Sequence, residues 1–199
     1  IIEDDYDSEF RPNGKPLPTL FSMDACEKVI YMNTFSKSLT PTIRISYMIL
    51  PVHLANQFYR QLSFYSCTVS NFEQYTLAAF INQGYFEKHI NRMRLFYSRQ
   101  RKKLIEAIEH SSLKEKCRII ENDSGLHFLL HLQTELSDQC LSEQLKQQGI
   151  KMRPLSEYFL TAENSREHYF IINYSCVDLE KIPAACEKIS QLLSEKNTK

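Results

Sequence analysis

Three short, mostly apolar segments lie in the first 50 residues, and the first two of them are followed by polar loops. Ile1-Ile2 lead into an acidic stretch, residues 29–32 (VIYM) lead into NTFSKS, and residues 44–50 (RISYMIL) end at a proline. Short strands that are mostly apolar are typical of a sheet that is covered on both faces, as in α/β proteins. The sequence therefore predicts an α/β fold that starts with a buried sheet.

The hydrophobic periodicity changes along the rest of the chain. Residues 52–110 carry apolar side chains three and four positions apart, which predicts two shorter helices and then a long one. Residues 111–199 mix strand and helix patterns, with one helix expected between Ser137 and Gly149 and the last one after Asp178. The strands expected in this part cover residues 118–120, 126–132, 150–153 and 168–174. The irregular segments expected in the whole chain are a loop over 11–18, a turn at 122–125 and a polar tail at 194–199.

The charge balance and the glycine content exclude several classes of site. The chain has 24 Lys and Arg residues against 24 Asp and Glu, so its net charge does not favour nucleic-acid binding by these residues themselves. We interpret the basic residues within 88–103 as the solvated face of a helix, a nucleic-acid site being the alternative. The four glycines lie far apart, so no glycine-rich phosphate loop is expected within these residues.

Other sequence features bear on location and processing. No apolar run approaches the roughly 20 residues of a membrane span, so no membrane partner is expected, and no signal peptide is visible within these residues. The chain starts inside an apolar segment, and we interpret it as a C-terminal fragment of a longer protein. The six cysteines form no CxxC pair and do not cluster with the histidines, so we expect reduced thiols in a cytoplasmic protein and no metal site.

Lys37 lies in the segment TFSKS, in the loop between two predicted strands. A solvated lysine is more usual on a helix face. At the end of a buried sheet, the amine loses hydration and becomes a nucleophile toward carbonyls, with which it forms Schiff bases. A lysine of an ordinary surface loop is the alternative explanation of this motif by itself.

A second polar motif, EDDYD, follows the first predicted strand. Ligands of open α/β sheets bind beyond the carboxyl ends of the strands. Along an extended chain, Asp4 and Tyr6 point to one side and Asp5 points to the other. A carboxylate and a phenol on one side are suited to hold the edge of a heteroaromatic ring. An acidic, solvent-exposed loop is the alternative.

The two motifs together match the needs of pyridoxal 5'-phosphate (PLP). This cofactor needs a lysine for a Schiff base, a carboxylate that keeps its ring nitrogen protonated, and cationic and hydroxyl donors for its phosphate. The side chains that meet these needs are Lys37, Asp4, Arg44, Thr34 and Ser36. The residues therefore favour PLP as the cofactor.

The strings IIEDDYDSEFR and VIYMNTFSKSLTPTIRISYMILP resemble those of PLP-dependent fold-type I aminotransferases. More narrowly, they resemble the aminotransferase-like domain of MocR-type bacterial transcription regulators of the GntR superfamily. RMR at 92–94 and GLHF at 125–128 match as well, and the resemblance covers essentially the whole chain. It implies the C-terminal part of the α/β fold-type I aminotransferase fold. The rest of the large PLP-binding domain would be residues 1–84, a long connecting helix 85–110, and a small α+β domain 111–199.

The resemblance also implies a role for each residue of the two motifs. Lys37 would hold PLP as an internal aldimine and move the proton between the substrate α-carbon and the cofactor. Asp4 would pair with the pyridinium nitrogen, and Tyr6 would hydrogen-bond the phenolic oxygen of the ring. The phosphate ligands would be Arg44, Thr34 and Ser36.

Several parts of the family pattern are missing from these residues. A phosphate-binding loop at a helix N-terminus, a ring-stacking aromatic, an asparagine and the winged-helix DNA-binding domain would all lie upstream. Aminotransferases place an arginine for the substrate carboxylate on a late strand, but residues 170–174 contain none, and Glu157 stands where some relatives carry one. Arg153 and Arg166 are the remaining candidates for this role. His127 is expected on a strand of the small domain, either as a core histidine or as a site residue.

Three functional hypotheses follow from these observations. The first is an effector domain that binds PLP or an amino compound, in a homodimeric regulator that contacts DNA only through its winged helix. The second is a catalytically active class I/II aminotransferase that acts on an amino acid. A winged helix upstream would favour the regulator, and a start methionine shortly before the cofactor domain would favour the enzyme. The third is an inactive fragment. We favour the first, because the motif match is close and a sensor does not need the missing substrate arginine.

Overall fold

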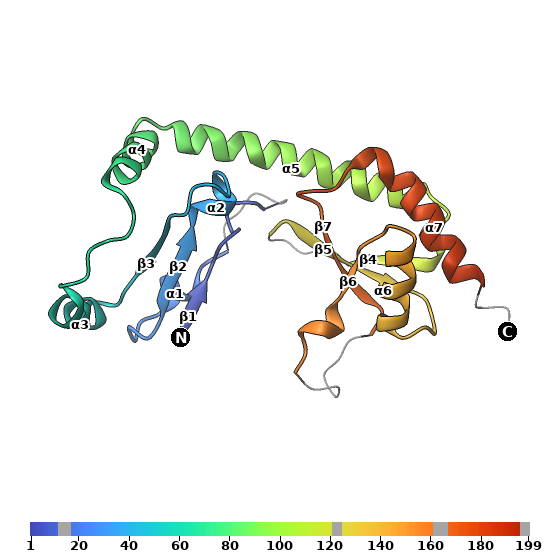
Figure 1. Cartoon of the computed structure of the whole chain (residues 1–199), viewed down its shortest axis with the longest axis horizontal. Coiled ribbons are helices and arrows are strands. Elements are labelled where there is room, and N and C mark those ends of the chain that lie inside the picture. Colours follow the sequence, from blue (N-terminus) through green and yellow to red (C-terminus); the bar gives the residue numbers. More distant parts are fainter. Residues whose placement is uncertain (12–16, 121–124, 161–166, 196–199) are drawn as a thin grey trace. The chain divides into compact units, whose positions relative to one another are not determined.

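The computed structural model describes residues 1–11, 17–120, 125–160 and 167–195 (Figure 1). The chain divides into two compact units, residues 1–94 and 95–199, and helix α5 (Tyr85–Glu109) contributes residues to both. The loop expected over 11–18, the turn at 122–125 and the polar tail fall largely outside the described residues. Among the residues described, no helix combines the length and the apolar character needed to cross a bilayer.

The first unit combines a three-stranded sheet with helices. Its elements are β1 (Ile2–Asp4), α1 (Leu20–Met23), β2 (Ile30–Thr34), α2 (Phe35–Ser38), β3 (Ser46–Ile49), α3 (Val52–Leu62) and α4 (Asn71–Asn82). The strand order is β1-β2-β3. β1 and β2 run parallel, because the chain crosses over between them through α1, whereas β3 returns antiparallel to β2.

The sheet of the first unit is covered on one face. The parallel register and the alternation along each strand place Asp4 and Thr34 on one face. Tyr31 and Asn33 lie on the other, which α1 covers, with the rings of Phe21 and Tyr31 centred 6.2 Å apart. All four residues of β3 are exposed. Burial of the sheet on both faces is therefore not observed among the described residues: Asp4 and Met32 on one face and the whole of β3 are exposed.

Apolar residues at helical spacing, Tyr75, Ala79 and Phe80, predict the second of the shorter helices, and the structure starts this helix, α4, one turn earlier, at Asn71. Its N-cap is Ser70, whose Oγ accepts a hydrogen bond from the N–H of Glu73 at 3.3 Å. The S-x-x-E pattern at these positions is a sequence signal for a helix start, and it precedes the apolar stripe. Gly84 follows the helix with a φ of +73°, a left-handed conformation that glycine adopts without strain.

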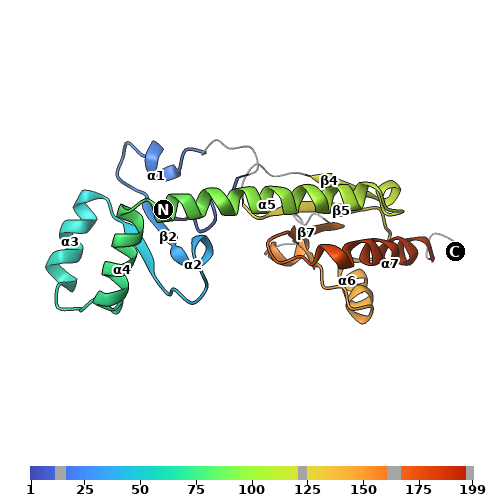
Figure 2. The same ribbon diagram turned by 90° about the horizontal axis from the view of Figure 1, so that it is seen from above.

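The second unit is built on a four-stranded antiparallel sheet. Its elements are η1 (Lys114–Lys116), β4 (Cys117–Ile120), β5 (His127–Leu132), α6 (Asp138–Gln147), β6 (Arg153–Pro154), η2 (Leu155–Tyr158), β7 (Tyr169–Asn173), η4 (Leu179–Lys181) and α7 (Ile182–Glu195). The strand order is β4-β5-β7-β6, and Figure 2 shows α7 and the second part of α5 along this unit. Leu104 of α5, Leu130 of β5 and Ile189 of α7 line one small cavity, so these three elements pack together.

The helix ends that the sequence predicts in the second unit are present. The Oγ atom of Ser137 accepts from the N–H of Cys140 at 3.4 Å at the start of α6, and Gly149 follows its end with a φ of +81°. Asp178 caps the short 3₁₀ segment η4, which leads into α7, and does not cap α7 itself. Local capping chemistry therefore predicted these boundaries to within one turn.

The strand expected over 150–153 is shorter than predicted. Only Arg153 and Pro154 pair with the neighbouring strand β7. The N–H of Ile150 instead donates to the carbonyl of Leu145 at 2.9 Å and completes the end of α6. The N–H of Ile150 is therefore used by the end of α6 and is not available to pair with a neighbouring strand.

Candidate functional site

The carboxyl ends of β1 and β2 lie at the same edge of the first sheet, because these strands run parallel. Asp4 is the last residue of β1, and Thr34 is the last residue of β2. The N–H of Asp5 donates to the carbonyl of Met32 at 2.9 Å, which continues the pairing beyond Asp4. The two sequence motifs therefore start side by side at this edge, which is the usual place for ligands of such sheets.

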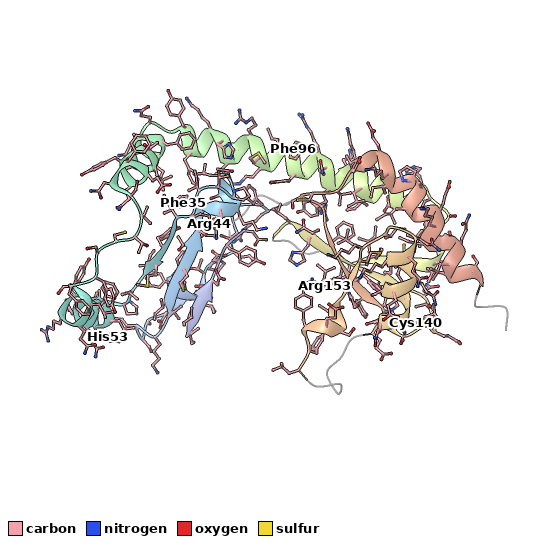
Figure 3. The ribbon with its side chains drawn as sticks, viewed as in Figure 1. Phe35, Arg44, His53, Phe96, Cys140 and Arg153 are labelled. Carbon is pink, nitrogen blue, oxygen red and sulfur yellow. The ribbon has the colours of Figure 1, made fainter. Side chains whose placement is uncertain are left out.

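Thr34, Ser36 and Arg44 form one hydrogen-bonded group at the start of α2, which we call the anion cluster. The Oγ1 atom of Thr34 accepts from the N–H of Ser36 at 3.2 Å and lies 3.1 Å from the Ser36 hydroxyl. The Nη1 atom of Arg44 (Figure 3) donates to Ser36 Oγ at 3.2 Å and to the carbonyl of Pro41 at 3.3 Å. The fold thus gathers a guanidinium and two hydroxyls, groups that suit a phosphate-type anion. Without a ligand, the Thr34 and Ser36 hydroxyls donate to the carbonyls of Ile45 and Ile43.

Lys37 lies in the last turn of α2, next to the buried Ser38. Its side chain is exposed, so the expectation that a buried sheet end removes hydration from the amine is wrong for the residues described. The reason is that α2 lies at the open edge of the sheet. Among the described residues, no hydrogen bond or ion pair holds the amine, which leaves it available to a ligand.

Asp4 and Tyr6 are both exposed, whereas the carboxylate of Asp5 is half-buried. Asp5 Oδ2 accepts from the hydroxyl of Tyr31 at 3.0 Å, on the covered face of the sheet. Asp5 therefore points away from the face that carries Asp4, as the alternation predicts. A ligand at the open face would therefore meet the carboxylate of Asp4 and not that of Asp5.

A series of hydrogen bonds between side chains on the covered face is not predicted from the sequence. Asn33 Nδ2 donates to Tyr31 Oη at 3.0 Å and to Glu9 Oε1 at 3.4 Å. Burial raises the pKa of Tyr31 to about 12, and burial also raises the pKa of Glu9 above its ordinary value of 4.5. The alternation of side chains along β2 could have predicted these hydrogen bonds, because it puts Tyr31 and Asn33 on the face opposite Thr34.

We expect the substitution Glu9→Gln to raise the free energy of unfolding near neutral pH. Burial, and then the carboxylates of Asp5 and Asp7, raise the pKa of Glu9 in the folded chain above 4.5, so folding favours the protonated acid. The wild-type chain loses stability as the pH rises from 4.5 through this raised pKa, whereas the neutral amide does not titrate. The other titratable or charged groups near Glu9 are the neutral phenols of Tyr31 and Tyr47 and the guanidinium of Arg94.

Urea unfolding of both chains over a pH series measures this effect. The difference between them should be smallest below pH 4.5 and should grow in favour of the variant as the pH rises. Glu135→Gln, at an exposed position, is the matched control and should show no such growth. A difference that is constant with pH would contradict the prediction.

A family model described as aminotransferase class I and II matches residues 6–189. The chain belongs to the class I and II aminotransferase family. Among similar curated proteins, the uncharacterized HTH-type transcriptional regulator YdeL of Bacillus subtilis is 47% identical over 156 residues, which cover 78% of this chain and 34% of that protein. The probable rhizopine catabolism regulatory protein MocR of Rhizobium meliloti is 36% identical over 89% of this chain and 36% of its own length.

A solved aminotransferase shows the same fold. The kynurenine aminotransferase of Pyrococcus horikoshii, in complex with PMP, matches with a TM-score of 0.81 and 26% identity, over 100% of this chain and 48% of that one. The expected fold class, part of the fold-type I aminotransferase fold, is confirmed. The chain spans 34% and 36% of the length of the two curated relatives.

Further candidate residues of this aminotransferase segment lie in the second unit. His127 is half-buried at the start of β5. Arg153 (Figure 3) is exposed, and its Nε atom lies 3.6 Å from the carboxylate of Glu157. Its Nη1 atom also donates to the hydroxyl of Tyr158 at 3.2 Å. Arg166 lies outside the described residues. A carboxylate-binding role for either arginine stays a prediction.

Proposed function

We propose that the chain is a PLP-binding, aminotransferase-like effector domain of a MocR/GntR-type transcription regulator, which senses PLP or an amino compound through Lys37. The observation that carries this proposal is the meeting of the anion cluster, the exposed Lys37 and Asp4 at one sheet edge. The similarity to HTH-type regulators over most of the chain supports the regulatory role. We infer that the parent protein is a cytoplasmic homodimer that contacts DNA through a separate domain.

The side chains at this edge fit PLP in chemical type and in exposure. Lys37 offers the amine that binds the cofactor aldehyde, and the anion cluster offers cationic and hydroxyl donors to the phosphate. Asp4 would hold a proton on the ring nitrogen, and Tyr6 would donate to the phenolic oxygen. Asp4, Tyr6 and Lys37 are all exposed, so a ligand can reach them. When bound, PLP supplies the electron sink for chemistry at an amino compound.

An active aminotransferase is the second candidate function. The 26% identity to a kynurenine aminotransferase over the whole chain favours it. The two candidates differ in what an amino acid does to the PLP-loaded chain. An enzyme releases a keto acid and leaves the cofactor in its amine form, whereas an effector domain binds the amino compound and releases none. Incubation with a panel of amino acids, followed by measurement of keto acid, separates the two functions.

We expect Arg44→Ala to weaken PLP binding by about ten- to a hundredfold, because a hydrogen bond to a charged group contributes roughly 1.5–3 kcal/mol. The substitution removes the guanidinium of the anion cluster and, with it, the hydrogen bond that the guanidinium donates to Ser36 Oγ. Titration with PLP, followed by the visible absorption of the bound cofactor, gives the dissociation constant. Arg60→Ala removes an exposed arginine of α3 and should bind like the wild type. Equal affinities of the two variants would refute the phosphate role of Arg44.

A further inference from the structure

We propose that Asn33 is a positioning residue for this site: its carboxamide ties the loop that carries Tyr6 to the strand end that carries Thr34. This inference rests on the proposed function, because it explains how the two motifs of the site are held in register. Asn33 is 4% exposed and lies on the covered face of the sheet, opposite Thr34 and Asp4. It therefore acts through other residues and not by contact with a ligand on the open face.

The Asn33 carboxamide makes hydrogen bonds to Tyr31 and Thr34 of its own strand, β2, and to Glu9 of the loop that follows β1. Its Nδ2 atom donates to Tyr31 Oη at 3.0 Å, and the Tyr31 hydroxyl in turn donates to Asp5 Oδ2 at 3.0 Å. The same nitrogen donates to Glu9 Oε1 at 3.4 Å. Its Oδ1 atom accepts from the N–H of Thr34 at 2.5 Å. One buried amide thus uses both donors and its acceptor, which no apolar residue at this position reproduces.

These bonds fix the loop that carries Tyr6 at both of its ends. Asp5 is held by Tyr31, as described, at the start of the loop. Glu9 is held at the end of the loop by the carboxamide and by the Nε atom of Arg94, which donates to the Glu9 carbonyl at 2.6 Å. The second carboxyl oxygen of Glu9 is buried without a partner among the residues described. Loss of the Asn33 bond therefore leaves this carboxyl with no partner on β2.

The strand end is fixed by the same side chain. Thr34 is the N-cap of α2, and its hydroxyl belongs to the anion cluster. The bond from its N–H to Asn33 Oδ1 sets the backbone at the point where β2 turns into α2. Movement of Asn33 would therefore displace the anion cluster and the Tyr6 loop together, although Thr34 lies on the opposite face of the sheet.

Asn33→Asp is the sharpest test of this inference. It keeps the size and the acceptor for the N–H of Thr34, but it replaces the two N–H donors with an anionic oxygen. We expect PLP affinity to fall about tenfold. We also expect the titration midpoint of the Glu9 carboxyl, followed by ¹³C NMR without ligand, to move upward, because the Asn33 hydrogen bond lowers that pKa in the wild type. Asn82→Asp, exposed at the end of α4, makes the same change in charge and should alter neither measurement.

The double variant with Asn33→Asp and Glu9→Gln separates positioning from a general defect in the fold. It moves the amide donor from position 33 to position 9, so an N–H···O bond between the two side chains is restored. We expect its PLP affinity to return to within about threefold of the Glu9→Gln single variant. A defect in packing alone would not be repaired by this exchange.

The outcomes distinguish this inference from the proposed function. PLP binding by the wild type with unchanged affinity and unchanged Glu9 titration in Asn33→Asp would overturn the inference alone. Loss of affinity that the double variant does not repair would give Asn33 a merely structural role, which also overturns it. Absence of PLP binding by the wild-type chain would overturn the proposed function and the inference together.

Discussion

Replacing Lys37 with alanine is expected to abolish covalent attachment of PLP to the chain. The lysine amine is the nucleophile that condenses with the aldehyde of the cofactor, and alanine offers no substitute. The exposed position of Lys37 in α2 makes the amine accessible in the unliganded chain. Attachment is measured by the visible absorption of the PLP-loaded chain, then by borohydride reduction and mapping of the modified peptide.

A matched lysine separates specific attachment from general amine reactivity. Lys88 is exposed on α5, where its ammonium lies 5.7 Å from the ring centre of Tyr85. Lys88→Ala should keep the wild-type absorption band and the label on Lys37. Label that is spread over many lysines in the wild type, or an undiminished band in Lys37→Ala, would contradict the assignment of Lys37.

Phe170→Ala is expected to lower the free energy of unfolding of the second unit by about 3–5 kcal/mol. Phe170 is fully buried on β7, a strand with hydrogen-bonded neighbours on both sides. Its pairing partners are Leu130 on β5 and Pro154 on β6. Removal of the ring leaves a cavity that close-packed neighbours fill only in part. Urea unfolding followed by NMR signals of this unit measures the loss.

A second phenylalanine of the same unit provides the control for this prediction. Phe96 on α5 is 50% exposed and contacts the ring of Tyr97 at 5.4 Å between centroids. Phe96→Ala should cost less than half as much as Phe170→Ala, because less apolar area leaves water at this position. Equal losses for the two variants would show that the sheet around Phe170 is not the core of the unit.

The meeting of the two motifs could be predicted from particular residues. Asp4 and Thr34 each end an apolar segment, and the carboxyl ends of parallel strands meet at one edge of a sheet. The hydroxyls and the guanidinium of the anion cluster lie within one short stretch of sequence, so their closeness is a local property. The exposure of Lys37 could not be predicted in this way, because it depends on what covers the sheet edge.

Helix caps and hydrophobic periodicity are local features of the sequence. They were enough to predict the class of fold, most strands and helices, and helix starts such as that at Ser137. The same is true of the chemistry that the motifs offer. Three-dimensional packing was needed for the open face of the first sheet, for the shortened β6 and for the chain from Asp5 to Glu9 through Asn33. The hydrogen bonds from Tyr31 to Asp5 and from Asn33 to Glu9 join residues that lie more than 20 positions apart in sequence. Their partners depend on which segments pair and which backbone groups are already used, and no local pattern carries that information.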